Sequence, residues 1–279
     1  MKGRLTLQGR KFVIVGQNGE QRVLPCQLLE RTVRVPHRGD SLRLLAFSDY
    51  RVQDIGSLIR FVKSQPRPDL ILYAGDDIRR FSEPETNFFE RLAVLSRYGL
   101  CAVAGNDDKP EVRELITGRH VYAVHSCALV LGRFAILGIE GAPMFPIRNG
   151  FDRSYNKGSL LYPEPILDWH IRHWMTGAFK RKKLIVVSHA PPYGVLDFAM
   201  RFGRRNIGSR PLRKFLETSP NALLCVSGHV HSQGARSERF GSALVVNAAS
   251  HDGPGDPGRV AIIEIANGVV SAPDWHEIS

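Results

Sequence analysis

The feature that most constrains the fold is a series of short apolar runs, most of them followed directly by a polar residue. The runs occupy residues 42–47, 70–74, 101–104, 134–139, 184–187, 222–226, 243–246 and 260–265. They are too short for helices, rich in β-forming residues and apolar almost throughout, which is typical of strands covered on both faces. Segments with helical periodicity lie between several of them, so we predict an α/β fold.

Helical spacing of apolar residues predicts helices within 55–62, 88–95 and 166–174, and Ser209 before Pro211 marks a further helix start. Residues 1–40 differ, because runs at 12–15 and 22–24 flank Asn18-Gly19, a strong signal for a tight hairpin turn. We therefore predict a β-rich extension over 1–40, packed on a main domain over 41–279, with 36–40 as its linker.

Composition narrows the class of protein. Lys and Arg number 38 against 27 Asp and Glu, a net charge of +11, which favours an anionic substrate or partner. Nucleic acid suits this charge, but no helix-turn-helix, zinc-finger, RNP or KH motif accompanies it. No run approaches the roughly 20 apolar residues of a membrane span, and Met1-Lys-Gly-Arg leads into no signal-peptide core. We expect a cytoplasmic protein with no membrane partner.

The cysteines are far apart in sequence and show no C-x-x-C spacing. A disulfide scaffold and a zinc ribbon are therefore excluded, and we predict reduced core residues. The four are Cys26, Cys101, Cys127 and Cys225.

The polar residues after the runs are the kinds that bind metals. In open α/β sheets the ligand site lies at the carboxyl ends of the strands, so residues distant in sequence can converge there. Taken singly, each has an ordinary interpretation as a turn former or helix cap. As a series of carboxylates, amides and imidazoles they suit Mn²⁺, Fe²⁺ or Zn²⁺ better than Ca²⁺. The series is Asp49, Asp76, Asn106, His189, His229 and His231.

These motifs resemble the calcineurin-like metallophosphoesterase superfamily, whose pattern is D-x-H, G-D, G-N-H-[D/E], a His near Pro, and G-H-x-H. The resemblance covers residues 43–265, and its second half is similar to the small microbial class III phosphodiesterase branch. It implies a four-layer sandwich of two mixed sheets flanked by helices. The matching segments are Asp49-Tyr50-Arg51, Gly75-Asp76, Gly105-Asn106-Asp107-Asp108, His189-Ala-Pro-Pro and Gly228-His229-Val230-His231.

The resemblance also implies ligand sets for one or two divalent ions per chain. One site takes Asp76, Asn106, His189 and His229, and all four are present. The other takes Asp49, Asp76, His231 and the His of D-x-H, which is Arg51 here. The histidine of G-N-H, catalytic in the family, is Asp107. Both departures remove an imidazole from the implied active site.

Arg51 has two interpretations. Its guanidinium cannot donate an electron pair to a metal, so it can replace the first metal and pair with Asp49 or Asp107 at about 2.7–3.0 Å. Alternatively it points to solvent, and both metals bind, the first with fewer protein ligands.

The resemblance implies a metal-dependent phosphoesterase, most naturally a phosphodiesterase that hydrolyses a nucleotide or similar small phosphate ester by metal-activated water. We expect Arg51 and Asp107 to act in catalysis. Arg204 and Arg205 are candidates to bind the anionic substrate, and the alternative interpretation is a solvated face. The alternative function is a catalytically impaired homologue that serves as a ligand-binding or regulatory module.

Overall fold

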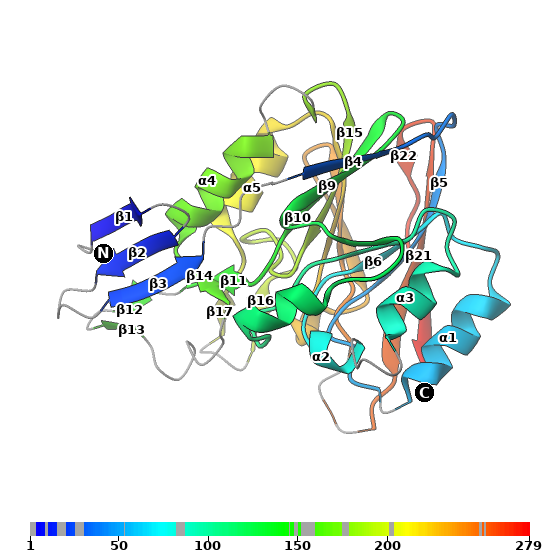
Figure 1. Ribbon diagram of the computed structural model, residues 1–279, viewed down its shortest axis with the longest axis horizontal. Coiled ribbons are helices and arrows are strands. Elements are labelled where there is room, and N and C mark those ends of the chain that lie inside the picture. Colours follow the sequence, from blue (N-terminus) through cyan, green and yellow to red (C-terminus); the bar gives the residue numbers. More distant parts are fainter. Residues whose placement is uncertain are drawn as a thin grey trace.

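A computed structural model of the chain describes residues 4–8, 11–15, 21–25, 31–52, 54–81, 87–144, 146–147, 150–151, 160–174, 179–200, 204–250, 253 and 255–279. Two seven-stranded sheets form its centre. In Figure 1, α4 and α5 lie on the outer side of one sheet, and α1 and α3 lie on the outer side of the other. The predicted α/β fold with two mixed sheets flanked by helices is confirmed.

The first sheet is parallel across β10, β15, β18 and β20 and antiparallel at β9 and β19. Its strands, in spatial order, are β19 (Arg236–Phe240), β20 (Ala243–Asn247), β18 (Ala222–Ser227), β15 (Lys183–Ser188), β10 (Phe134–Ile139), β9 (Cys127–Leu131) and β4 (Arg31–Val35).

The second sheet is parallel from β5 to β8, and β21 runs antiparallel to β5 and to both β22 and β23. Its strands, in spatial order, are β22 (Val269–Val270), β21 (Gly258–Ala266), β5 (Leu42–Phe47), β6 (Leu70–Tyr73), β7 (Leu100–Ala102) and β8 (Val121–Ala123), with β23 (Asp274–Ile278) paired to β21.

Strand alternation divides the apolar side chains between two cores. Leu44 and Ala46 of β5 pack between the sheets with Val187 of β15, whereas Leu45 and Phe47 face the helices. The helical elements are α1 (Ile55–Ser64), α2 (Ile78–Phe81), α3 (Phe88–Ala93), α4 (Glu164–Trp174), α5 (Arg210–Thr218) and the 3₁₀ turns η1 (Pro110–Leu115) and η3 (His231–Gln233). The predicted start of α5 is confirmed, because the Ser209 side chain caps the backbone N–H of Leu212.

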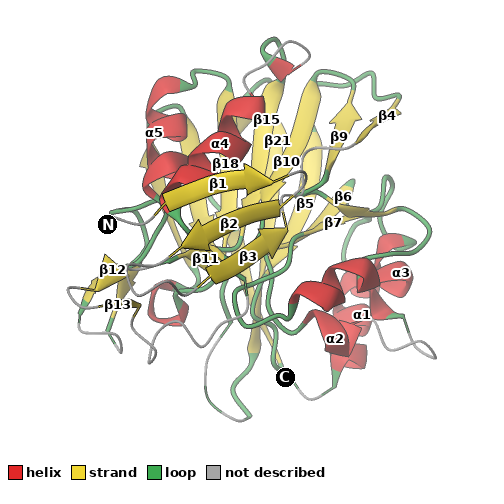
Figure 2. Cartoon of the chain, turned by 60° about the vertical axis from the view of Figure 1, so that its left-hand side comes forward, coloured by secondary structure: helices red, strands yellow, loops and turns green. Residues whose placement is uncertain are grey.

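The N-terminal strands β1 (Arg4–Gln8), β2 (Lys11–Val15) and β3 (Gln21–Pro25) form an antiparallel sheet of their own (Figure 2), which Figure 1 shows apart from the two large sheets. The predicted pairing of 12–15 with 22–24 is confirmed, while its turn at Asn18-Gly19 lies outside the described residues. β4 pairs in parallel with β9 and so belongs to the first large sheet. The domain boundary at residue 40 stays a prediction.

Three short pairs complete the described strands: β11 (Ala142–Pro143) with β14 (Leu161–Tyr162), β12 (Pro146–Ile147) with β13 (Gly150–Phe151), and β16 (Phe198–Ala199) with β17 (Arg205–Asn206). Cys101, Cys127 and Cys225 are free and buried, as predicted, and Cys26 lies outside the described residues. Among the described residues, no helix is long and apolar enough to cross a membrane.

Candidate metal centre

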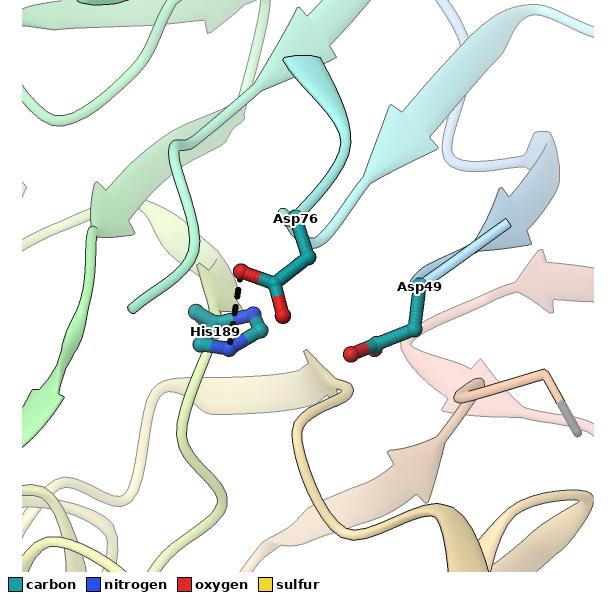
Figure 3. A group of neighbouring side chains, drawn as sticks. All are labelled: Asp49, Asp76 and His189. Carbon is teal, nitrogen blue, oxygen red and sulfur yellow. Dashed lines mark ion pairs between the residues drawn. The ribbon is translucent and has the colours of Figure 1, made fainter. Parts of the chain in front are cut away.

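The carboxyl ends of β5, β6 and β15 bring three ligand-type side chains together. Asp49 and Asp76 follow β5 and β6, and His189 follows β15 on the other sheet. One ligand atom from each lies within 4.8 Å of the others, and all three residues are buried (Figure 3). The sandwich therefore juxtaposes residues that are far apart in sequence, and together they can hold a metal ion.

The backbone at these strand ends is strained. Asp49, Asp76 and His229 have φ values of 51°, 63° and 66°, the left-handed region that side chains other than glycine rarely adopt. The neighbouring Gly228 allows close approach, because a Cβ there would lie 2.0 Å from Ser48 Oγ and 2.3 Å from Asp49 Oδ2. Such conformations cost stability and are concentrated at functional sites.

Hydrogen bonds orient His189 as a metal ligand. Its Nδ1 lies 2.8 Å from the Ala74 carbonyl oxygen, which only accepts, so Nδ1 carries the ring proton. Burial lowers the pKa of His189, so the ring is neutral and Nε2 holds a lone pair. Nε2 lies 2.9 Å from Asn106 Oδ1 and 3.7 Å from Asp76 Oδ1.

The orientation of Asn106 is fixed as well. Its Nδ2 donates to Asp107 Oδ1 at 2.7 Å, which turns Oδ1 toward His189. His189 Nε2 and Asn106 Oδ1 therefore face each other without a proton between them, and Asp76 Oδ1 lies beside them. A cation would relieve this arrangement, so the donor set fits the divalent metal that the resemblance implies.

The two buried aspartates differ in their protein partners. Asp49 Oδ2 accepts from Ser48 Oγ at 2.6 Å and from the His229 backbone N–H at 3.0 Å, and its Oδ1 lies 3.1 Å from His231 Nε2. Burial raises the pKa of Asp49, but the hydrogen bond and charge of His231, together with the Ser48 hydrogen bond and further nearby charge, leave that pKa lowered.

Asp76 has the opposite balance. Burial raises its pKa first, and the charges of Asp49, Asp107 and Asp108 raise it further. The Asp107 backbone N–H, which donates to Asp76 Oδ1 at 3.0 Å, offsets only part of this. A cation beside Asp76 would stabilise its ionised form.

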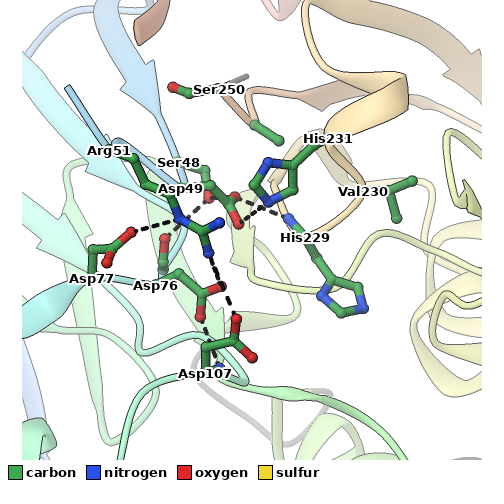
Figure 4. Close-up of polar contacts among 12 residues, drawn as sticks. Ser48, Asp49, Arg51, Asp76, Asp77, Asp107, His229, Val230, His231 and Ser250 are labelled. Atoms are coloured by element: carbon green, nitrogen blue, oxygen red, sulfur yellow. Dashed lines mark hydrogen bonds and ion pairs between the residues drawn. The ribbon is translucent and has the colours of Figure 1, made fainter. Parts of the chain in front are cut away.

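His229 lies beside His189, with ring centroids 5.1 Å apart. Burial lowers its pKa to about 3, so this imidazole is also neutral and able to act as a ligand. Figure 4 shows the ring of His231 beside Asp49.

Arg51 lies among carboxylates, and one of its two expected partners, Asp107, is within ion-pair distance. Its Nε donates to Asp77 Oδ2 at 3.1 Å, and its Nη2 lies 3.6 Å from Asp107 Oδ2 and 3.9 Å from Asp76 Oδ2 (Figure 4). Among the described residues the nearest carboxylate is that of Asp77, and the Asp107 contact is longer than the expected 3.0 Å. The Arg51 side chain is 36% exposed, so it faces the mouth of the centre.

Arg204 and Arg205 lie at β17, in the hairpin next to His231. Ser232 Oγ and Gln233 Nε2, both in η3, donate to the Phe198 carbonyl of β16 at 3.3 Å. Arg204 is exposed and Arg205 half-buried. Their role in substrate binding stays a prediction.

From the sequence, no role is assigned to three contributors: Ser48, Asp77 and Asp108. Buried Asp108 accepts from the backbone N–H groups of Gly105 at 2.8 Å and Ile78 at 3.0 Å, which ties the two aspartate-bearing loops together. Burial raises its pKa to about 7. Each of the three belongs to one of the motifs or lies next to a motif residue. This position in the sequence is the only signal that could have identified them.

Comparisons with solved structures agree with this fold. A dimetal phosphatase from Danio rerio is 13% identical, with 85% of this chain and 98% of that chain covered and a TM-score of 0.53. A putative 5′-nucleotidase from Staphylococcus aureus is 11% identical with a TM-score of 0.51, with 85% of this chain and 54% of that longer chain covered. A third structure, 17% identical, covers 86% of this chain and 100% of its own with a TM-score of 0.60. At these identities the likeness shows the fold alone.

No curated protein matches the chain in sequence. The model of the calcineurin-like phosphoesterase family matches residues 39–233, well over half of the chain, and that region contains every motif residue of the centre. The chain belongs to the calcineurin-like phosphoesterase family.

Proposed function

We propose that this chain is a metal-dependent phosphodiesterase that acts on a nucleotide or a similar small phosphate ester. The observation that carries the proposal is the convergence of the His189 Nε2 lone pair with Asn106 Oδ1 and Asp76 Oδ1. With His229 beside His189, these residues form the proposed ligand set. Asp49 and His231 border it on the other side.

A divalent ion bound here would lower the pKa of a water molecule toward about 7 and neutralise charge on the phosphoryl oxygens. The protein residues around the ion hold the protonation states that ligands need. His189 and His229 stay neutral, and Asp49 stays ionised through its contacts with Ser48 and His231. Manganese, iron and zinc all suit carboxylate, amide and imidazole ligands.

The residues at the mouth favour a diester over a monoester. Asp77 and Asp107 both border the centre, and they repel a doubly charged monoester more strongly than a singly charged diester. Asp107, paired with Arg51, is also a poor proton donor for a departing alkoxide. We therefore expect preference for substrates whose leaving group needs little protonation.

A second function remains a candidate because of two residues. Arg51 and Asp107 stand where the family pattern has histidines, and both lie at the mouth of the centre. A chain that binds metal and phosphate but hydrolyses nothing would act as a ligand-binding or regulatory module.

Metal-supplemented hydrolysis of bis-p-nitrophenyl phosphate, p-nitrophenyl phosphate and 2′,3′-cyclic nucleotides distinguishes the two functions. We expect hydrolysis of the diesters, lost in His189→Ala and His229→Ala together with stoichiometric metal binding. His276→Ala, which removes a histidine from β23, is the matched control and should change neither. Metal binding without turnover of any ester would favour the second function. Unchanged metal content in both variants would reject the ligand assignment.

The leaving-group argument has its own test. Rates across diesters of graded leaving-group pKa should fall steeply as that pKa rises, and Asp107→His should help poor leaving groups more than good ones. If the rate is independent of leaving-group pKa while the chemical step is rate-limiting, the role given to Asp107 is contradicted.

A further inference from the structure

Arg51 is surrounded by carboxylates from two different loops. Asp76 and Asp77 follow β6, and Asp107 follows β7. The guanidinium contacts all three, at 3.1 Å to Asp77, 3.6 Å to Asp107 and 3.9 Å to Asp76 (Figure 4). The shortest contact is through Nε, which leaves the terminal nitrogens directed toward the centre. Asp77 therefore anchors Arg51 at the metal ligands.

The two oxygens of Asp76 have different surroundings. Oδ1 lies in the proposed donor set with His189 and Asn106, whereas Oδ2 lies 3.9 Å from Arg51 Nη2. Metal–oxygen bonds to carboxylates are about 2.0–2.2 Å long, so no ion fits between Oδ2 and that nitrogen. A guanidinium has no lone pair to offer, so it repels a metal there without ligating it.

Asp49 has protein partners on both sides. Its Oδ2 accepts hydrogen bonds from Ser48 Oγ and the His229 backbone N–H, and its Oδ1 lies at ion-pair distance, 3.1 Å, from His231 Nε2. A metal ion therefore fits on the Oδ1 side of Asp76, whereas the Oδ2 side already faces the Arg51 guanidinium.

We propose that Arg51 is the second cation of this centre, so that each chain binds one divalent ion and the guanidinium contacts a phosphoryl oxygen of the bound substrate. The exposed fraction of Arg51, 36%, leaves it accessible to a phosphate at the mouth. Its planar fork of donors matches phosphate oxygens. The substrate contact rests on the proposed function, but the metal count does not.

The first experiment counts metal. Wild-type protein and the variants Arg51→His and Arg60→His are loaded with Mn²⁺, dialysed and measured by inductively coupled plasma mass spectrometry. We expect about one ion per chain in the wild type and an increase toward two in Arg51→His, because the imidazole removes the fixed charge and adds a ligand. Arg60→His is the matched control, since the Arg60 side chain in α1 is 70% exposed and pairs with Asp54 at 2.7 Å; it should stay at one.

Two ions in the wild type would overturn the proposal, and so would one ion in a folded Arg51→His variant. Circular dichroism and thermal unfolding establish folding, and Arg51 lies outside any helix or strand.

The second experiment measures inorganic phosphate binding to the Mn²⁺-loaded protein by titration calorimetry. Arg51→Met should weaken binding by at least about tenfold, since a charge-assisted hydrogen bond is lost, and Arg60→Met should leave it unchanged. Equal affinities would reject the substrate contact. Neither measurement requires turnover, so both remain decisive even if no ester is hydrolysed.

Discussion

Two buried polar clusters lie at strand ends in this protein, and they differ in how their charges are balanced. One is the metal centre. The other, here called the Arg113 cluster, consists of Arg113 in η1, His125 after β8, Glu140 after β10, Tyr162 in β14 and His170 in α4. Both clusters bury carboxylates and imidazoles, so burial by itself does not distinguish them.

The Arg113 cluster is balanced within the protein. Arg113 pairs with Glu140, and Tyr162 contacts both. His125 Nδ1 accepts the Glu140 backbone N–H at 3.2 Å, and His170 Nε2 donates to the Gly138 carbonyl at 3.2 Å. The one cation and the one anion of the cluster thus neutralise each other.

The metal centre has a surplus of electron-pair donors instead. His189 Nε2 and Asn106 Oδ1 face each other at 2.9 Å, and burial and like charges raise the pKa of Asp76. A cavity of about 180 Å³ lies beside the Arg113 cluster, and its lining residues include none of the proposed metal ligands. The uncompensated donors, and not the cavity, are therefore the basis for the candidate metal centre.

The largest expected effect comes from unbalancing the Arg113 cluster. Glu140→Gln removes the counter-ion of a buried guanidinium, so the free energy of unfolding at pH 7.5 should fall by about 3 kcal/mol or more in urea titrations. Glu264→Gln, which breaks the more exposed pair with Arg43, should cost less than about 1 kcal/mol. Equal losses in the two variants would show that the Arg113 pair is not a buried, balanced cluster.

The next effect is stabilisation by metal. Mn²⁺ at 100 times its dissociation constant should raise the free energy of unfolding by about 2.7 kcal/mol, because only the folded state brings the ligands together. His189→Ala should lose this increment, and His170→Gln should keep it. Thermal unfolding with and without EDTA measures both. An increment that survives His189→Ala would place the ion elsewhere.

A smaller effect concerns pH. Burial lowers the pKa of His125 and of His170 to about 3, well below the 6.5 of the unfolded chain. The unfolded state therefore binds more protons between these values, and stability falls as pH drops below about 6.5. With EDTA present, the free energy of unfolding falls between pH 7.5 and pH 5, and His170→Gln should reduce this fall by about 1–2 kcal/mol. An unchanged loss would mean that His170 is already protonated when folded.

Much of this could be predicted from the sequence because it depends on local pattern. Every large-sheet strand that the apolar runs predicted is present, and each begins and ends within two residues of its run. The convergence of Asp49, Asp76 and His189 follows from a general property of strand ends. These conclusions need only residue order and fold class.

Pairings between distant side chains had no such signal. Glu140 meets Arg113 across 27 residues, and no periodicity links them. Arg51 contacts Asp77 because of the path that its long side chain takes, which the family pattern does not specify. The parallel pairing of β4 with β9 likewise joins segments about 90 residues apart, and no sequence pattern specifies it.

The smallest effect tests the difference between the two clusters most directly. Removing a carboxylate charge should lower the free energy of unfolding at the Arg113 cluster but raise it at the metal-free metal centre. In metal-free protein at pH 7.5, Asp76→Asn removes a buried charge whose pKa burial and neighbouring carboxylates raise, and Asn keeps an oxygen to accept the Asp107 N–H. The free energy of unfolding should therefore rise by about 1 kcal/mol, although Mn²⁺ no longer stabilises the variant.

The stability that Asp76→Asn adds to the metal-free protein should become smaller as the pH falls toward 4. A folded-state pKa above the unfolded value of 3.8 makes the wild type relatively more stable as pH falls, and this contribution is lost as pH rises. Asp168→Asn, at a partly exposed pair in α4, serves as the control and should change stability by less than about 0.5 kcal/mol. If Asp76→Asn instead destabilises the metal-free protein, then Arg51 and the backbone already balance Asp76. The metal centre would in that case be a second cluster of the Arg113 kind.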